Sequence, residues 1–385
     1  MGSSEAVEAA GAIAGLAADH ADEGERARKL SRPVVDAMVE AGFFRLCVPR
    51  SVGGGEADAA VLIEVCEELA RGDAAAGWCI AVMSTAGMVA AYIPEDEALE
   101  IYGSADAVVG GVFAPRGRAV PDGEGYRITG RWPFSSGVDH CDWLLGGCIV
   151  ERDGKPELLE GGRPDVRLCL FPASEAEVID TWTVSGLRAT GSHDIALEDA
   201  LVPAVRTASV ISEKPVATGA LYAFPVFGLL ALTIAGVALG IGRAAIDDLI
   251  ELAGGKTPTA STRKLAERAT TQTQIAQAEA GLRAARAFLY EAVAEAWGAA
   301  VAIGAVSLDQ RTALRLAATH ATTASAAAVD SAYNLGGGTS IYETSPLQRR
   351  FRDVHAATQH MLVGSSTWEL TGRLLLGLPT DVAQL

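Results

Sequence analysis

The stretch GYRITGRWPFSSGVDHCDW, residues 125–143, decides the fold of this chain. It opens as a run of β-branched and aromatic residues and passes through an apolar tripeptide, Trp132–Pro133–Phe134. Two adjacent hydroxyls, Ser135 and Ser136, then meet Gly137, a residue type that favours tight turns. A run of this kind, bounded by turn residues, predicts a β-strand that ends in a turn at the two serines.

The same pattern of short apolar runs separated by turn residues extends over residues 108–212. Short β-branched or aromatic runs recur there, among them VVGGVFAP, DWLLGGCIV, VRLCLFP and HDIALEDALVP. Gly, Pro and Asp separate these runs, as they separate strands in small all-β domains. We therefore predict a middle β-domain that forms a barrel or a sandwich.

Helical patterns flank this region on both sides. Residues 5–107 are rich in Ala and Glu, with apolar positions at three- and four-residue spacing, as in SRPVVDAMVEAGF (31–43). Ser31 is expected to begin that helix and Gly42 to end it. Residues 213–377 contain long alanine-rich helices, the longest expected over 263–300, with one glycine-rich break in NLGGGTS (334–340).

A chain of 385 residues exceeds a single typical core. We predict three domains: N-terminal helices over 1–107, the β-domain over 108–212 and a helix bundle over 213–385. The fold class is α+β and mostly α.

Composition and charge narrow the possible partners. The net charge of −17 argues against a nucleic-acid or anionic-membrane surface, because phosphate binding needs clustered Lys and Arg. The uncharged segment 227–242 is shorter than the roughly 20 residues of a membrane span and is predicted to be a buried bundle helix. Six scattered cysteines and the lack of a signal-peptide pattern predict a reducing, cytoplasmic location and no metal site.

Four strings, taken in order, carry a resemblance that spans almost the whole chain. They are MVEAGFFRLCVPRSVGGGEAD (38–58), GYRITGRWPFSSGVDHCDW (125–143), DTWTVSGLRATGSHDIALEDALVP (180–203) and GGGTSIYETSPLQRRFRDVHAATQH (336–360). Together they resemble the acyl-CoA dehydrogenase fold, and more closely its group D branch of two-component, reduced-flavin-dependent monooxygenases. The resemblance implies an N-terminal helical domain, a middle β-barrel or sandwich and a C-terminal four-helix bundle.

The resemblance also implies a function. A monooxygenase of this branch takes reduced FMN or FAD from a separate flavin reductase and uses O2 to hydroxylate an aromatic or polycyclic organic substrate. The alternative is an acyl-CoA dehydrogenase or a related FAD-dependent desaturase or oxidase, and a third class is a non-catalytic flavin-binding partner. We further expect a homotetramer, or at least a homodimer, because the C-terminal helices carry more apolar surface than one amphipathic face requires.

The residues after Arg352–Asp353 favour the monooxygenase. Dehydrogenases of the usual type carry a Glu base a few residues after such a pair, whereas this chain has His360 and Met361 there. Glu369 is either a displaced base or a helix-surface carboxylate. Some dehydrogenases draw their base from another helix, and Glu251 and Glu291 are the candidates for that role here. We expect His360 to be an imidazole of near-neutral pKa that accepts a phenol proton or bonds the oxygenated flavin. Asp353, seven residues earlier, is expected to share its helical face, about 10 Å away along the axis.

The resemblance places the turn at Ser135 and Ser136 beside the flavin ring. A hydroxyl there bonds flavin N5 or, after oxygen adds, the hydroperoxide, and the sequence leaves open which serine does so. Trp132 and Phe134 are expected to line the ring pocket, with burial in the core as the competing interpretation.

Further flavin contacts follow from the resemblance alone. Arg188, in GLRATGSHD, is a candidate contact with the flavin or another anion. Arg263, Gln272 and the three glycines Gly336, Gly337 and Gly338 are candidates for the phosphates and adenine, partly of a neighbouring subunit's flavin. His355 lies about 140° from His360 on a helix, so the two are not expected to share a site.

Overall fold

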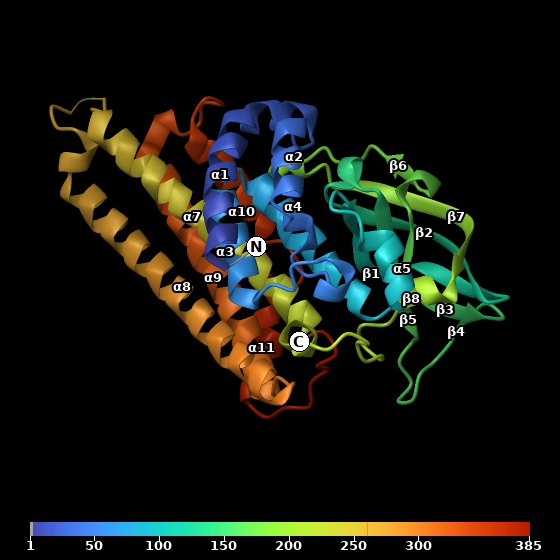
Figure 1. Cartoon of the computed structure of the whole chain (residues 1–385). Coiled ribbons are helices and arrows are strands. Elements are labelled where there is room, and N and C mark those ends of the chain that lie inside the picture. The colour runs from blue at the N-terminus through green and yellow to red at the C-terminus, as the bar shows by residue number, and fades with distance from the viewer. Residues whose placement is uncertain (1–2, 260) are drawn as a thin grey trace.

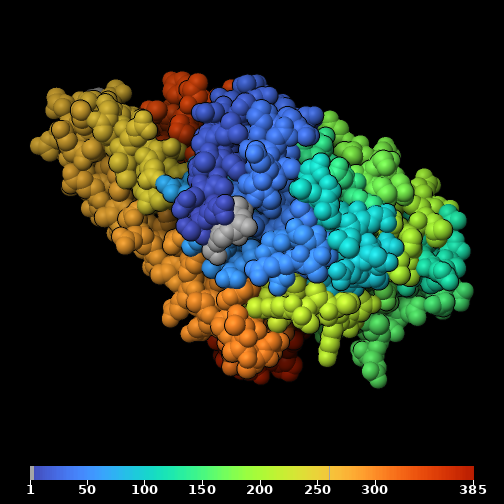
Figure 2. All heavy atoms as spheres, viewed as in Figure 1, coloured from blue at the N-terminus to red at the C-terminus, as the bar shows by residue number. Residues whose placement is uncertain are grey.

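The computed structural model describes residues 3–259 and 261–385 and has a helical part and a β part lying side by side (Figure 1). Five N-terminal helices come first: α1 (Ser3–Ala27), α2 (Arg32–Glu40), α3 (Ala59–Gly72), α4 (Ala74–Ala86) and α5 (Glu95–Tyr102). In the space-filling view these helices lie between the C-terminal bundle and the sheet (Figure 2). They therefore connect the two other parts of the molecule.

The ends of α2 show how local sequence sets a helix. Pro33 occupies its first turn, where the missing N–H costs nothing, and Gly42 follows its end with φ of 68°. Ser31 precedes the helix as predicted, but its buried hydroxyl makes no hydrogen bond to the helix. The expected start and stop are thus in place, without a side-chain cap at the start.

The β part is one eight-stranded sheet. Its strands are β1 (Val109–Asp122), β2 (Gly125–Ser135), β3 (Trp143–Arg152), β4 (Lys155–Pro156), β5 (Val166–Pro172), β6 (Glu177–Ile179), β7 (His193–Pro203) and β8 (Thr207–Ala208). The order is β6-β7-β2-β1-β3-β5-β8, with β4 paired to β3. β1 and β3 run parallel, while the other neighbours are antiparallel. The sheet encloses its own apolar core, which includes Trp132, Phe171 and Ile195.

The C-terminal bundle consists of α7 (Val226–Gly255), α8 (Ala269–Ile303), α9 (Leu308–Gly336), α10 (Pro346–Ala357) and α11 (Ser366–Leu375), preceded by the short α6 (Ala220–Ala223). The expected start of the longest helix at residue 263 is wrong. Residues 263–268 form a loop with a 3-10 turn over Leu265–Glu267, and the α-helix begins at Ala269. The bundle otherwise has the layout that the fold class predicts.

Two helical segments, Ala74–Ala91 and Val226–Gly255, are long and apolar enough to cross a membrane by length and composition alone. Each is 94% buried within the fold over the most apolar window. α7 packs against α3, α9 and α10, so its apolar run serves the bundle core. The predicted buried helix is confirmed.

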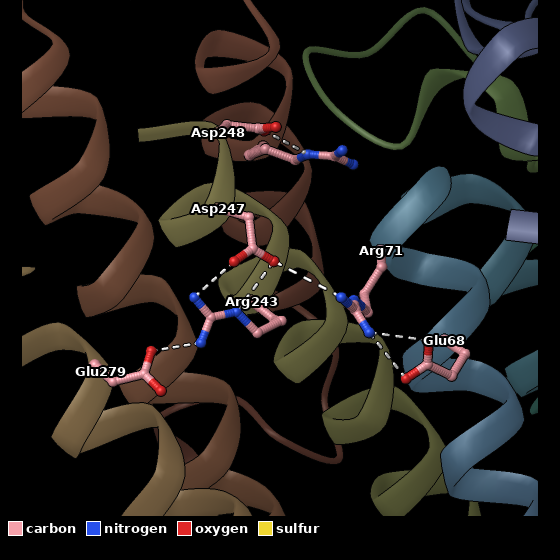
Figure 3. A network of polar contacts seen from close by, with 7 residues as sticks. Glu68, Arg71, Arg243, Asp247, Asp248 and Glu279 are labelled. Carbon is pink, nitrogen blue, oxygen red and sulfur yellow. Dashed lines mark hydrogen bonds and ion pairs between the residues drawn. The ribbon is translucent and has the colours of Figure 1, made fainter. Parts of the chain in front are cut away.

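A chain of ion pairs joins three helices on the outer side of α7. Arg243 of α7 pairs with Asp247 at 2.9 Å and also with Glu279 of α8 (Figure 3). Arg71 of α3 pairs with Glu68 at 3.1 Å and with the same Asp247 at 3.8 Å. These charges directly follow the apolar run of α7 and link α3, α7 and α8 at their surface.

Candidate active site

The turn after β2 is built around two residues with positive φ. Phe134 has φ of 70° and Gly137 has φ of 72°, and a non-glycine residue in this region marks a constrained backbone. The Gly137 amide donates to the Thr190 carbonyl at 2.7 Å. A Cβ atom on Gly137 would lie 2.4 Å from the sulfur of Met83. Glycine is required here both for the turn and for the close approach of α4.

The two serines of this turn have different surroundings. Ser135 is fully buried, and its hydroxyl has no hydrogen-bond partner. The Ser136 hydroxyl accepts from the indole N–H of Trp78 at 3.2 Å and bonds the Ser192 hydroxyl at 2.7 Å. A buried hydroxyl without a partner is unusual in a folded protein and indicates a position that a ligand can satisfy.

Ser136 begins a connected set of polar contacts. Ser192 bonds the Thr190 hydroxyl at 2.6 Å, and Thr190 donates to the Leu187 carbonyl at 2.8 Å. The Leu187 amide in turn donates to Asp353 of α10 at 2.7 Å. Burial raises the pKa of Asp353 to about 7. These contacts connect the end of β2 with the 3-10 turn Arg188–Thr190 and with the bundle.

His360 lies near the turn after β2, beside Trp78. Its expected helical face shared with Asp353 and its expected near-neutral pKa are both wrong. α10 ends at Ala357, so His360 stands in the turn beyond the helix and does not share a helical face with Asp353. Desolvation lowers the pKa of His360 to about 4, with a further contribution from the nearby Arg315, so the imidazole is neutral at pH 7. The Leu362 amide donates to Nδ1 at 3.3 Å, which places the proton of the neutral ring on Nε2.

Trp78 of α4 contacts both Ser136 and His360. Its indole N–H reaches Ser136, and its ring meets the His360 ring edge-on, with the centroids 5.8 Å apart. The sequence analysis did not identify Trp78, which lies in a helix that is apolar all round. A single large indole among small residues was the only signal available.

The aromatic residues of β2 divide between core and surface. Trp132 is completely buried in the sheet, where its N–H donates to the Gly147 carbonyl at 2.7 Å and its ring packs near Phe171. No face of the Trp132 ring is exposed, which favours burial in the core over a place in the flavin pocket. Phe134 is 68% exposed and meets Trp182 edge-on at 6.1 Å, so this pair offers an aromatic surface.

Arg188 lies on the 3-10 turn beside the hydroxyl set, and its buried Nε has no partner. His355 pairs with Asp330 at 2.8 Å on α9, which is the structural role expected for it. Glu369 is exposed on α11, as are Glu251 on α7 and Glu291 on α8. None of these three carboxylates has the buried position of a displaced dehydrogenase base.

The remaining candidates form a second cluster. The exposed Arg263 and Gln272 flank the start of α8, while Gly336, Gly337 and Gly338 end α9. Lys256, which the sequence analysis missed, joins them by donating to the Gly336 carbonyl and to Thr339 at 2.6 Å.

Within one chain the two clusters lie at opposite ends of α7. Arg315, beside His360, reaches the Phe227 carbonyl near the start of α7, whereas Lys256 directly follows its end. The rise of an α-helix over that span is about 40 Å. The α7–α8 connection lies on the far side of the molecule from the sheet (Figure 1). The structure therefore does not bring Gly336 to Gly338, Arg263 or Gln272 together with Ser136 and His360.

The groups around Ser136 suit a flavin ring. Among the described residues, the Ser135 hydroxyl and the Arg188 Nε are buried without a hydrogen-bond partner. The ring pair of Phe134 and Trp182 lies next to Ser135 at the end of β2. A flavin ring is planar and carries hydrogen-bonding edges, so an aromatic surface next to free polar groups fits it.

Comparisons with known proteins agree with this geometry. Residues 8–97 match the family described as "Acyl-CoA dehydrogenase, N-terminal domain", and residues 232–364 match "Acyl-CoA dehydrogenase, C-terminal domain". The indole-3-acetate monooxygenase of Pseudomonas putida is 36% identical over 92% of this chain and 89% of its own. The oxygenase component of the FADH(2)-dependent resorcinol hydroxylase of a Rhizobium species is 28% identical over 94% of this chain and 91% of its own.

Among solved structures, XiaF from Streptomyces sp. in complex with FADH2 and glycerol superposes with a TM-score of 0.88 at 28% identity. The match covers 99% of this chain and 97% of that one. The chain therefore belongs to the acyl-CoA dehydrogenase superfamily, in its branch of flavin-dependent monooxygenases.

Proposed function

We propose that this chain is the oxygenase component of a two-component system that hydroxylates an aromatic compound with O2 and reduced FMN or FAD. Its relatives include an indole-3-acetate monooxygenase, the oxygenase component of an FADH(2)-dependent resorcinol hydroxylase and the oxygenase subunit of a flavin-dependent monooxygenase. The observation that carries the proposal is the meeting of Ser136 and His360 at Trp78. Glu369, the candidate for a displaced dehydrogenase base, is exposed on α11. Bound reduced flavin supplies two electrons, so one oxygen atom of O2 enters the substrate and the other leaves as water.

Ser135, Ser136 and His360 bind and orient as neutral groups. The two serine hydroxyls are buried and neutral, so they hold hydrogen-bonding partners without delivering a proton freely. His360 presents a neutral ring with its proton on Nε2, which suits it to donate to a substrate oxygen. Trp78 contacts both residues, Ser136 through its indole N–H and His360 through its ring.

The activity can be tested directly. Purified protein is mixed with photochemically reduced FAD or FMN and with a panel that includes indole-3-acetate and resorcinol, under ¹⁸O₂. We expect one labelled oxygen atom in the product of at least one aromatic compound. Bleaching of bound oxidised FAD by octanoyl-CoA, without labelled product, would instead establish the dehydrogenase alternative.

Replacement of both Ser135 and Ser136 by alanine is expected to uncouple the reaction. The double variant should fold, because each hydroxyl contributes only about 1 kcal/mol to the free energy of unfolding. More of the electrons from reduced flavin should then appear as hydrogen peroxide and fewer as hydroxylated product. Peroxide and product are quantified in the same single turnover, and wild-type coupling in the double variant would reduce the serines to turn residues.

We propose further that the chain is a cytoplasmic homotetramer that receives its flavin from a separate reductase. Large apolar side chains are exposed at the end of α8 and beyond α11, including Ile303 and Leu376, each at 76%. The six cysteines are free thiols, as in a reducing compartment. The separation of the two clusters along α7 supports an assembly in which the Lys256 end of one chain reaches the flavin of another.

Light scattering at micromolar concentration is expected to give the mass of four chains. Ile303→Glu combined with Leu376→Glu places charges in the apolar patches and should shift the population to smaller species. Exposed Leu158→Glu on the β side is a matched control that should leave the mass unchanged. A monomer mass for the wild type would contradict the assembly and, with it, any flavin contact between chains.

A further inference from the structure

The hydrogen bonds among the hydroxyls of Ser136, Ser192 and Thr190 can be donated in only one direction. The Leu187 carbonyl only accepts, so the Thr190 hydroxyl donates its single proton there. Thr190 must then accept from Ser192, because its own proton is already used. Ser192 has no second proton, so the contact between Ser136 and Ser192 is donated by Ser136. Ser136 therefore donates to Ser192, Ser192 donates to Thr190, and Thr190 donates to the Leu187 carbonyl.

Trp78 reinforces this direction at the other end. An indole N–H is a donor only, so Ser136 accepts from Trp78 while it donates to Ser192. A hydroxyl has one proton and two lone pairs, which leaves Ser136 with a single free lone pair. Ser136, Ser192 and Thr190 are each at most 5% exposed, so water does not readily supply an alternative partner. Any ligand group that binds at Ser136 must therefore donate a hydrogen bond.

We infer that Ser192 and Thr190 are positioning residues that make Ser136 an acceptor and thereby give the site a preference for reduced over oxidised flavin. The inference rests on the proposed function. Reduced flavin carries a hydrogen on N5 and donates there, whereas N5 of oxidised flavin only accepts. We place N5 at Ser136, whose free lone pair accepts from the first but leaves the second facing a lone pair. Such a preference suits a protein that must collect reduced flavin while oxidised flavin is present.

The test measures binding rather than turnover. Dissociation constants are determined by protein and flavin fluorescence under anaerobic conditions, for dithionite-reduced FAD and FMN and for their oxidised forms. Ser192→Ala removes the acceptor for the Ser136 proton, so that proton can turn toward N5 of oxidised flavin. We expect the ratio of the oxidised to the reduced dissociation constant to fall by roughly tenfold, the effect of one neutral hydrogen bond.

Thr190→Val is the more telling variant, because the Thr190 hydroxyl bonds Leu187 and Ser192 and reaches Ser136 only through Ser192. Without the Thr190 acceptor, Ser192 turns its proton toward Ser136, and the ratio should fall as it does in Ser192→Ala. Thr190→Ser restores the hydroxyl and should restore the ratio. The controls are Ser325→Ala and Thr322→Val, buried hydroxyls of α9 that donate to the Ala321 and Ala318 carbonyls at 2.8 and 2.9 Å.

The outcomes separate the inference from the proposed function. A wild-type preference for reduced flavin that falls in Ser192→Ala and Thr190→Val, but in neither control, supports the inference. Equal wild-type affinity for both forms, or a preference that both variants retain, overturns the inference and leaves the monooxygenase proposal standing. A wild-type protein that binds neither form contradicts the proposed function as well.

Discussion

His360→Ala is expected to lower the yield of hydroxylated product by roughly 10²-fold or more, the usual cost of losing one preorganised donor at a reacting centre. The neutral ring holds its proton on Nε2 beside Trp78, so the variant removes a donor and leaves space where the imidazole stood. Product is measured in a single turnover, at saturating reduced flavin and with the substrate identified by ¹⁸O labelling. Unchanged yield would make His360 a packing residue.

His360→Asn and the pH profile distinguish a donor from a base. Asparagine keeps an N–H donor without a basic ring nitrogen, so it should recover part of the lost yield if His360 donates. Because the pKa of His360 is lowered to about 4, the ring stays neutral from pH 8 down to about 5, and product yield should not fall over that range through this residue. A decline centred near pH 6.5 would show an unperturbed base instead.

The same shift has a consequence for stability, and its sign is definite. The unfolded chain binds a proton at His360 near pH 6.5, whereas the folded chain does so only near pH 4. Protonation therefore favours the unfolded state between these values. The contribution of His360 to the free energy of unfolding is complete above pH 6.5 and is lost as the pH falls toward 4.

Trp132→Ala is expected to lower the free energy of unfolding by about 3–5 kcal/mol, the usual cost of truncating a fully buried tryptophan. The ring fills space beside Gly117, Gly130 and Gly146, where added Cβ atoms would lie between 2.3 and 2.7 Å from it. The variant also leaves the Gly147 carbonyl without its indole donor. Urea denaturation followed by circular dichroism measures the change.

Phe134→Ala is the matched comparison, since it removes an aromatic ring from the same strand at an exposed position. It should change the free energy of unfolding by less than about 1 kcal/mol. A Trp132→Ala protein as stable as the wild type, but unable to bind flavin, would return Trp132 to the flavin pocket and refute its assignment to the core.

Sequence patterns predicted the parts of this molecule that depend on local chemistry. Gly, Pro and Asp between the apolar runs marked the ends of the strands. The Ser-Ser-Gly sequence marked the turn after β2, because turn conformation depends mainly on the residues within the turn. The helix expected over residues 263–300 started too early, since Arg263 to Arg268 are good helix formers that tertiary contacts hold in a loop.

The site itself depended on contacts between distant segments. Trp78 and Ser136 are 58 positions apart, and Ser192 meets Ser136 across 56 positions, so no spacing rule could pair them. His360 was placed two turns after Asp353 on the assumption that α10 continues, whereas the helix ends at Ala357. The low pKa of His360 follows from desolvation in the folded state, which its neighbours in sequence do not reveal.

The length of α7 determines which pairs of inactivating mutations can complement each other. Its two ends carry groups about 40 Å apart, which in the proposed assembly serve two different flavins. A mutation at the Lys256 end and a mutation at the His360 end of the same chain then inactivate two different flavin sites. Two inactive alleles expressed in one cell can assemble mixed particles that contain some intact centres. Genetic complementation between the two ends, and none within either end, is the expected signature of such shared construction.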